Sequence, residues 1–238
     1  MTRGQSDTLA ILREADERLA ERPGDDAAHE RRARALLALG RLDEAEHAAS
    51  AAVRLDPEEI RYRELLAEVL SARGAHHDAA TEYARLAHND PRQRDWTLAE
   101  AGERLDADEA GRAVAAARRA VRLDPDDADA QLALSRSLAA AGDGAGALRA
   151  AVVAAGLRPN DLAAREALAD ARWLADQDAA AFAEFRALAG ELSGGARERV
   201  VEKARRLYLQ HAGPLGRLLA ALPALFAFAL SRGWLRVT

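Results

Sequence analysis

The stretch Val121-Arg122-Leu123-Asp124-Pro125-Asp126-Asp127 joins the end of one helical run to the start of the next. Its proline cannot continue a helix, and the two carboxylates after it favour a new helix N-terminus. The same proline recurs at a strict spacing of 34 residues, as Pro23, Pro57, Pro91, Pro125 and Pro159. A helix-ending residue that returns at this period indicates one structural unit copied along the chain.

Small residues recur at the same period in two further columns. One column holds Ala33, Ala67, Ala101, Ser135 and Ala169, and the other holds Ala45, Ala79, Ala113, Ala147 and Ala181. Two helices can approach closely where side chains are this small. Between the columns, Gly40, Gly74 and Gly142 mark a turn that leaves the first helix in a left-handed conformation. The sequence therefore predicts helix, turn, helix in each of five units: 26–59, 60–93, 94–127, 128–161 and 162–192.

This pattern resembles the tetratricopeptide repeat, whose motif has a period of 34 residues, a small residue at position 8, glycine at 15, alanine at 20 and proline at 32. The unit 60–93 matches best, with Leu66, Ala67, Gly74, Ala79, Tyr83 and Pro91. The resemblance covers residues 26–192. It implies an all-α solenoid of about five helix-turn-helix units, with an N-terminal helix in residues 1–25 and capping helices in residues 193–238.

The third unit departs most from the motif. Glu100 and Arg104 occupy two positions that are usually apolar, and Asp108 stands where glycine is expected, as does Asp176 in the last unit. The spacing of the remaining apolar face still predicts a helix: Leu98, Ala101 and Leu105. Before the repeats, residues 7–22 are expected to form one helix with Asp7 as its N-cap.

The charge changes sign towards the C-terminus. Residues 197–238 contain eight cationic residues and two glutamates, a net charge of +6, whereas the whole chain carries −5. Residues 1–196 therefore carry −11, which argues against nucleic-acid binding by the repeats, because phosphate neutralisation needs clustered Arg or Lys. The absence of cysteine excludes disulfides and thiolate zinc sites.

The basic C-terminal segment contains two apolar parts. Val200, Ala204 and Leu207 fall on one helical face, as in a helix that docks on the last repeat. The run 218–230 is apolar on every side, but it is short for a membrane span and contains Pro223. We expect the docking contacts of this segment to come from its large apolar side chains: Leu218, Leu222, Leu225, Phe226, Phe228 and Trp234.

No motif in the sequence proposes a reaction, a cofactor or a metal site. The glycines of residues 142–146 fall on the turn of a repeat, with no preceding strand, so they are not expected to bind phosphate. The triplet His76-His77-Asp78 contains metal-ligating residue types, but an exposed turn is the better account. Residues 1–7 do not resemble a secretory signal, so a cytoplasmic protein is expected.

The family resemblance implies a partner-binding groove lined by the first helix of each unit, chiefly at positions 2, 5, 9, 12 and 13. These positions contain eight carboxylates, three arginines and a tryptophan: Glu30, Arg34, Arg61, Glu64, Glu68, Asp95, Asp106, Asp129, Arg136, Glu166, Asp170 and Trp173. We therefore predict a mostly acidic groove that attracts a basic or amphipathic segment of another protein. Ordinary solvated surface charge is the competing interpretation. For Trp173, the competing interpretation is packing against the C-terminal helix.

Three hypotheses of function remain open. The first is a non-catalytic interaction scaffold that uses the acidic groove. The second is an assembly subunit or homo-oligomer in which segment 215–235 packs on another chain. The third is a peripheral adaptor that contacts a membrane surface through the same segment. The charges also allow an intramolecular arrangement, in which the basic segment occupies the chain's own groove through Arg205 or Arg206.

Overall fold

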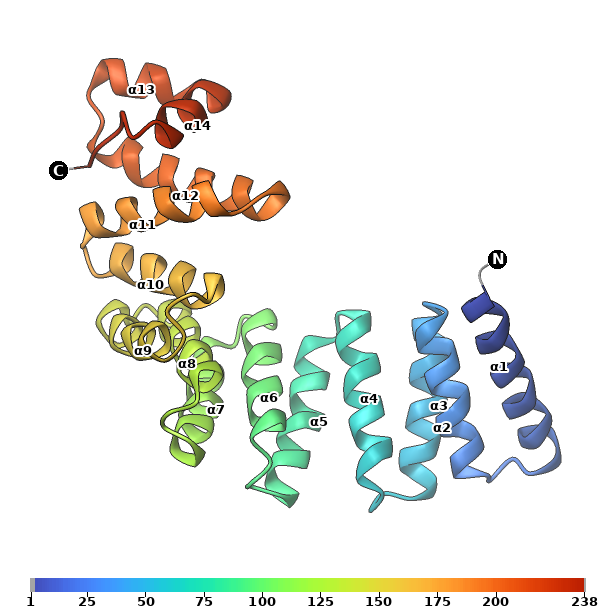
Figure 1. Cartoon of the computed structure of the whole chain (residues 1–238). Helices are drawn as coiled ribbons and strands as arrows, with labels where there is room; N and C mark the ends of the chain where they lie inside the picture. The colour runs from blue at the N-terminus through green and yellow to red at the C-terminus, as the bar shows by residue number, and fades with distance from the viewer. Residues whose placement is uncertain (1–2, 238) are drawn as a thin grey trace. The chain divides into compact units, whose positions relative to one another are not determined.

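The computed structural model describes residues 3–237, which are almost entirely helical and contain no strand (Figure 1). Contacts between residues divide the chain within α7 (Ala110–Leu123) into two compact units, Met1–Ala116 (unit 1) and Ala117–Thr238 (unit 2). Each unit is described separately below. The predicted all-α repeat architecture is confirmed.

Unit 1 is a series of antiparallel helices, each packed on the next in chain order. Its helices are α1 (Arg3–Glu21), α2 (Asp26–Ala38), α3 (Leu42–Leu55), α4 (Ile60–Arg73), α5 (His76–Asn89) and α6 (Arg94–Asp106), followed by the start of α7. The first helix corrects the sequence prediction, because α1 begins at Arg3 and Asp7 lies inside it instead of capping it. The Thr8 hydroxyl donates to the Gly4 carbonyl at 2.9 Å, within the extra turn.

Unit 2 contains further repeat hairpins, and the helices after them do not follow the repeat. Its helices after α7 are α8 (Ala128–Ala140), α9 (Gly144–Leu157), α10 (Leu162–Leu174), α11 (Asp178–Glu191), α12 (Gly194–His211), α13 (Pro214–Ala220) and α14 (Pro223–Ser231). The pairs α8–α9 and α10–α11 are repeat hairpins, and α12 packs on α11. The alanines of the two small-residue columns are buried in both units, as close helix packing requires, for example Ala67, Ala79, Ala147 and Ala169.

Carboxylates after four of the five repeat prolines cap the next helix, whereas Gln93, which follows Pro91, makes no side-chain hydrogen bond that caps α6. Asp127 accepts hydrogen bonds from the backbone N–H groups of Asp129 and Ala130 at 3.1 and 3.2 Å. Asp161 does the same for Ala163 and Ala164 at the start of α10. These side chains satisfy donors that a helix N-terminus cannot satisfy itself.

The turn inside each hairpin has the same left-handed backbone whether its residue is glycine or aspartate. The φ angle is 80° at Gly74, and it is 59° at Asp108 and 57° at Asp176. Asp is one of the few residues with a side chain that tolerates this region. The two departures from the glycine column therefore keep the geometry of the repeat.

We expect Gly74→Ala to lower the free energy of unfolding by about 1–2 kcal/mol, because alanine at a positive φ is strained. Gly102→Ala is the matched control, since Gly102 lies inside α6 and a Cβ there meets no atom within 4 Å. In a helix interior this change is expected to add about 0.5–1 kcal/mol. Urea unfolding followed by circular dichroism measures both effects, and the same sign for both variants would contradict this account.

The first helix of the third unit, α6, buries the two charged residues that made its prediction difficult. Glu100 is 5% exposed and Arg104 is 8% exposed. The Arg104 guanidinium donates to Glu109 in the following turn, and Glu109 also lies 2.8 Å from His77 Nδ1. Desolvation pushes the pKa of Glu109 up, but hydrogen bonds from His77, Arg104 and Arg112 outweigh it and lower that pKa to about 2. Arg104 is thus buried beside a carboxylate that stays ionised.

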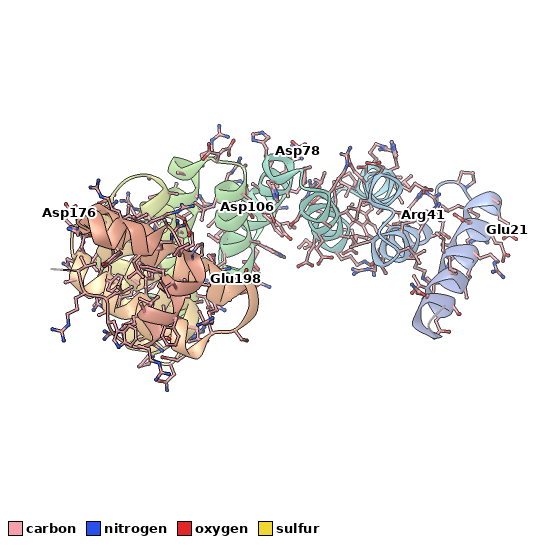
Figure 2. The ribbon with its side chains drawn as sticks, turned by 90° about the horizontal axis from the view of Figure 1, so that it is seen from above. Glu21, Arg41, Asp78, Asp106, Asp176 and Glu198 are labelled. Carbon is pink, nitrogen blue, oxygen red and sulfur yellow. The ribbon has the colours of Figure 1, made fainter. Side chains whose placement is uncertain are left out.

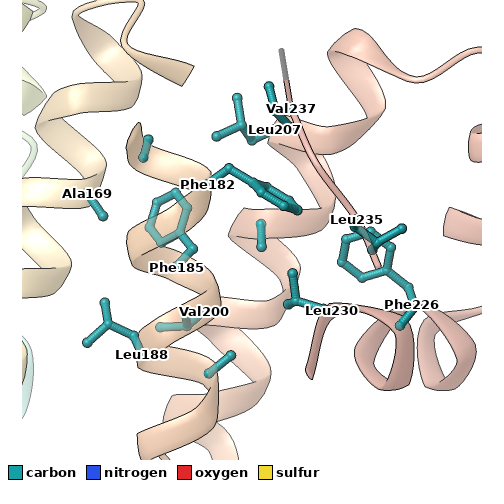
Figure 3. Close-up of a cluster of buried hydrophobic side chains, with 14 of the residues drawn as sticks. Ala169, Phe182, Phe185, Leu188, Val200, Leu207, Phe226, Leu230, Leu235 and Val237 are labelled. Atoms are coloured by element: carbon teal, nitrogen blue, oxygen red, sulfur yellow. The ribbon is translucent and has the colours of Figure 1, made fainter. Parts of the chain in front are cut away.

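The largest core of unit 2 connects the last repeat to the helices that follow it (Figure 3). Phe182, Phe185 and Leu188 come from α11, and they meet Val200 and Leu207 of α12. The predicted apolar face of residues 200–207 therefore packs on the last repeat. α14 and the segment after it close this core from the other side with Phe226, Leu230, Leu235 and Val237.

Candidate functional site

In unit 1, three of the carboxylates near the predicted groove lie around the side chain of Tyr83. Glu64 accepts a hydrogen bond from Trp96 Nε1 at 3.1 Å, which connects α4 to α6. Glu68 is exposed one turn further along α4. Burial, together with the negative charges of Glu68, Glu103 and Glu64, raises the pKa of Tyr83 to about 12. These carboxylates therefore share one electrostatic environment between α4, α5 and α6.

Glu103 and Asp106 add the contribution of α6. Glu103 accepts a hydrogen bond from the Ser71 hydroxyl and lies 2.8 Å from His76 Nδ1. Asp106, labelled in Figure 2, is the last residue of α6 and is exposed, and one of its carboxylate oxygens lies within 4.8 Å of the ligand atoms of His76 and Glu103. We call the four carboxylates Glu64, Glu68, Glu103 and Asp106 the acidic cluster.

The group His76, Glu103 and Asp106 has the donor types of a divalent-cation site, one imidazole and two carboxylates. The hydrogen bond between His76 and Glu103 also satisfies these groups without an ion. The sequence interpretation of His76 and His77 as a turn is corrected, because both residues begin α5. Their partners, Glu103 and Glu109, come from positions about thirty residues later.

The predicted groove residues nearer the N-terminus of unit 1 pair with one another. Glu30 is half-buried, and it accepts a hydrogen bond from Arg34 Nε at 3.1 Å. Arg61 Nη1 lies 3.9 Å from the same carboxylate. Asp95 is exposed and pairs with Arg94 at 3.3 Å. This part of the groove therefore carries less uncompensated negative charge than the acidic cluster.

In unit 2, the chain neutralises the predicted groove carboxylates itself. Asp129 receives two hydrogen bonds from Arg158, at 2.7 and 2.9 Å. Glu166 binds Arg199 and Lys203 of α12, and Lys203 Nζ also lies 2.6 Å from Asp170.

Local pKa shifts reflect this pairing. Burial raises the pKa of Asp170, although Lys203 opposes the shift. Burial also pushes the pKa of Glu166 up, but its two cationic partners outweigh burial and lower it. Arg136, the remaining charged residue of this groove face, is exposed. It favours the ionised form of Asp170 through its positive charge.

Two cationic residues of the C-terminal segment occupy this part of the predicted groove. They are Arg199 and Lys203, whereas Arg205 and Arg206 pair with Glu202 of their own helix. The sequence suggested that the basic segment could occupy the chain's own groove through Arg205 or Arg206. Within unit 2 the segment does contact the predicted groove residues, but through Arg199 and Lys203. It covers Glu166 and Asp170 and leaves no open acidic surface at α10.

Trp173 packs against the C-terminal helix, the competing interpretation from the sequence. Its ring stands edge-on to Phe185 at a centroid distance of 6.2 Å. Its Nε1 donates to Gln210 Oε1 of α12 at 3.2 Å. Trp173 is half-buried and joins the core of unit 2, so it is an anchor for α12.

The predicted docking residues of the C-terminal segment divide between core and surface. Phe226 is fully buried in the core of unit 2. Leu222, Leu225, Phe228 and Trp234 are 55%, 49%, 47% and 70% exposed. The side chain of Leu218 lies outside the described part of the structure. Among residues 3–237, no helix has the length and apolar character required to cross a membrane.

Glu103 is the member of the acidic cluster that sequence reasoning missed. It occupies position 10 of its unit, outside the positions implied by the family resemblance. Its spacing of three residues from Asp106, nearly one helical turn, was the only available signal. The fold, in contrast, brings Ser71 and His76 to it from α4 and α5.

Hairpins of this kind define the class of α-solenoid repeat proteins, whose stacked units present extended binding surfaces. Residues 6–69 match the model of the tetratricopeptide repeat family and belong to that family. The resemblance predicted from the sequence is thereby confirmed. A comparison with curated protein sequences gave no significant match.

Solved structures share the fold at low sequence identity. A tetratricopeptide repeat protein from Parabacteroides merdae has a TM-score of 0.69 and 14% identity, and the match covers 96% of this chain and 93% of that one. The C-terminal part of a repeat-containing protein from Cytophaga hutchinsonii has a TM-score of 0.69 and 15% identity, covering 95% and 91%. YrrB, described as having an unusual peptide-binding site, has a TM-score of 0.55 and 15% identity, covering 87% and 98%.

Proposed function

We propose that this chain is a non-catalytic protein–protein interaction scaffold, and that the acidic cluster of unit 1 binds a basic or amphipathic segment of a partner protein. The tetratricopeptide repeat family generally serves protein–protein interaction, and the structural neighbour YrrB carries a peptide-binding site. The proposal that the partner segment is basic or amphipathic, and that it binds the acidic cluster, is based on the charges of this chain.

The observation that carries the proposal is the contrast between the two units. Asp129, Glu166 and Asp170 of unit 2 are paired with cations of their own chain. In unit 1, Glu68 and Asp106 are exposed and form no ion pair among the described residues. Unit 1 contains 25 carboxylates and 17 arginines, so its net charge is −8. A negative potential of this kind speeds the encounter with a basic segment and disfavours nucleic acid.

The helix that contributes Glu103 and Asp106, α6, also offers contacts for an apolar side chain. Leu98 and Leu105 lie partly buried on α6, and Gly102 between them leaves open space where a Cβ would stand. A segment that alternates arginine with apolar residues can place the guanidinium on Glu68 or Asp106 and the apolar side chain beside these leucines. Carboxylates accept paired hydrogen bonds from guanidinium, which favours arginine over lysine.

The test measures the binding of a fluorescein-labelled peptide of alternating arginine and leucine residues by fluorescence anisotropy. We expect saturable binding that weakens as NaCl rises from about 50 mM to about 500 mM, because salt screens exposed charges. The double variant Glu68→Gln/Asp106→Asn is expected to raise Kd about tenfold, equivalent to about 1.4 kcal/mol.

The double variant Glu17→Gln/Glu21→Gln is the matched control, because it removes two exposed carboxylates of unit 1 on α1. It should leave Kd within about a factor of two, since distant surface charges are screened. If both double variants weakened peptide binding equally, the effect would come from net charge alone, and the acidic cluster would be rejected as the site. Absence of saturable binding at low salt would reject the proposed function.

A further inference from the structure

We propose that α13, α14 and the segment after them form a docking surface for an anionic lipid bilayer. This inference goes beyond the groove of unit 1 and concerns different residues. The juxtaposition that carries it is an exposed apolar patch bordered by arginines for which the described residues provide no carboxylate partner.

The first observation is that α14 has two apolar faces with different environments. Phe226, Ala229 and Leu230 are buried against the core of unit 2. The other face begins at Leu222 and continues through Leu225 and Phe228 at intervals of three residues, and all three side chains are about half exposed. A helix in water needs only one apolar face to pack on its own protein. The second face is therefore available for contact outside the chain.

The exposed face continues onto neighbouring segments and has a definite shape. The Trp234 ring stands edge-on to Phe228 at a centroid distance of 5.5 Å and is 70% exposed. Beside this pair lies a mainly apolar hollow of about 410 Å³, to which Tyr208 and Leu219 also contribute. Tryptophan and tyrosine side chains concentrate at membrane–water interfaces, because each combines an apolar ring with a polar group.

The second observation concerns charge. Residues 203–238 contain six cationic residues, with no aspartate or glutamate. Arg217, Arg232 and Arg236 border the patch in sequence and are exposed, and none forms an ion pair with a carboxylate among the described residues. Arg232 lies over the Phe228 ring at 5.3 Å, so its charge is held directly beside the apolar surface.

The exposed apolar patch and the arginines beside it together indicate which kind of partner binds this surface. A second copy of this surface would bring the same arginines face to face, because a two-fold interface joins identical patches. α14 extends over Pro223–Ser231, nine residues, whereas a spanning helix needs about 20 apolar residues. An anionic bilayer supplies an apolar layer for Phe228 and Trp234 together with negative head groups for the arginines. The geometry thus fits interfacial contact without insertion across the membrane.

Co-sedimentation of the full chain with vesicles tests the inference. The vesicles are phosphatidylcholine mixed with phosphatidylserine, and phosphatidylcholine alone. We expect the chain to bind the mixed vesicles and to bind neutral vesicles at least tenfold more weakly. Phe228→Asn/Trp234→Asn should reduce binding to the mixed vesicles at least tenfold, and Arg232→Gln/Arg236→Gln should reduce it about threefold to tenfold.

Two matched controls lie elsewhere in unit 2. Val152→Asn/Leu157→Asn changes two exposed apolar residues of α9, and Arg118→Gln/Arg149→Gln removes two exposed arginines. Both controls should bind mixed vesicles as the unchanged chain does. Circular dichroism checks that each variant keeps its helices. In addition, quenching by bromine-labelled lipid should be lower in Trp234→Phe than in the unchanged chain, which assigns the contact to this side chain.

Equal binding to neutral and anionic vesicles, or unchanged binding in both patch variants, would overturn the inference. Sedimentation equilibrium tests the alternative that a second copy of this chain binds the patch. A dimer that becomes a monomer in Phe228→Asn/Trp234→Asn, without any vesicle binding by the unchanged chain, would assign the patch to a second copy. Neither result affects peptide binding by Glu68 and Asp106, so the two proposals fail independently.

Discussion

Replacing Phe185 by alanine is expected to lower the free energy of unfolding by about 3–5 kcal/mol, the range for deleting a fully buried phenylalanine. Phe185 is 0% exposed, and its ring meets Trp173 of α10 edge-on. It shares one core with Val200 of α12 and Phe226 of α14 (Figure 3). Its loss should therefore weaken the last repeat and the helices packed on it together.

Urea unfolding of unit 2 measures the effect through Trp173 fluorescence, in a chain where Trp96 and Trp234 are phenylalanine. Phe185→Leu keeps most of the volume and should cost less than about 1.5 kcal/mol. Phe228→Ala is the control for an aromatic residue of the same unit that is 47% exposed, and it should cost less than about 1 kcal/mol. Similar losses for Phe185→Ala and Phe228→Ala would contradict the core described here.

Arg104→Ala is expected to lower the free energy of unfolding of unit 1 by roughly 3 kcal/mol. Breaking a buried ion pair costs about 3–5 kcal/mol, and the lower end applies because Glu109 keeps Arg112 and His77 as partners. The side chain of Arg104 also packs along α6, so alanine removes apolar contacts as well. Arg104→Met preserves most of this volume and should be less destabilising than alanine.

The dependence on pH distinguishes the ion pair from packing. The pKa of Glu109 is lowered from 4.5 to about 2 in the folded chain. A carboxyl group whose pKa is lowered by folding stabilises the fold when the pH is above its pKa in the unfolded chain. This contribution is lost as pH falls from about 4.5 towards 2. The difference in the free energy of unfolding between the unchanged chain and Arg104→Met should therefore become smaller as pH falls over this range. Unfolding monitored by Trp96 at pH 7 and near pH 3 tests this, and a constant difference would assign the effect to packing.

The recurring columns of the sequence predicted the repeat because each column reports a local requirement. Proline ends a helix, alanine permits close packing, and a left-handed turn needs glycine or a tolerant residue. Asp108 and Asp176 looked like breaks in the pattern, yet both adopt the φ angle of the glycines. The start of α1 was predicted four residues too late, because Asp7 has the residue type of a cap without the position of one.

The candidate site could be predicted only in part. The positions implied by the family resemblance located Glu64, Glu68 and Asp106, but they missed Glu103. They also treated Glu166 and Asp170 as open groove residues, whereas Lys203 pairs with both. That pairing depends on how α12 turns back onto α10 after the last repeat, and no column of the repeat encodes it.

The amino-acid sequence alone determined the helical repeat, its period, its turns and the opposite charges of its two ends. These properties follow from backbone preferences and from spacing, both of which act over a few residues or one period. Only the tertiary structure decided which charges are neutralised and which apolar side chains are covered. Glu68 stays open while Glu166 is paired, and Phe226 is buried while Phe228 is exposed. The physical reason is that pairing and burial depend on neighbours more than thirty residues away or on a neighbouring helix face, which only packing brings together.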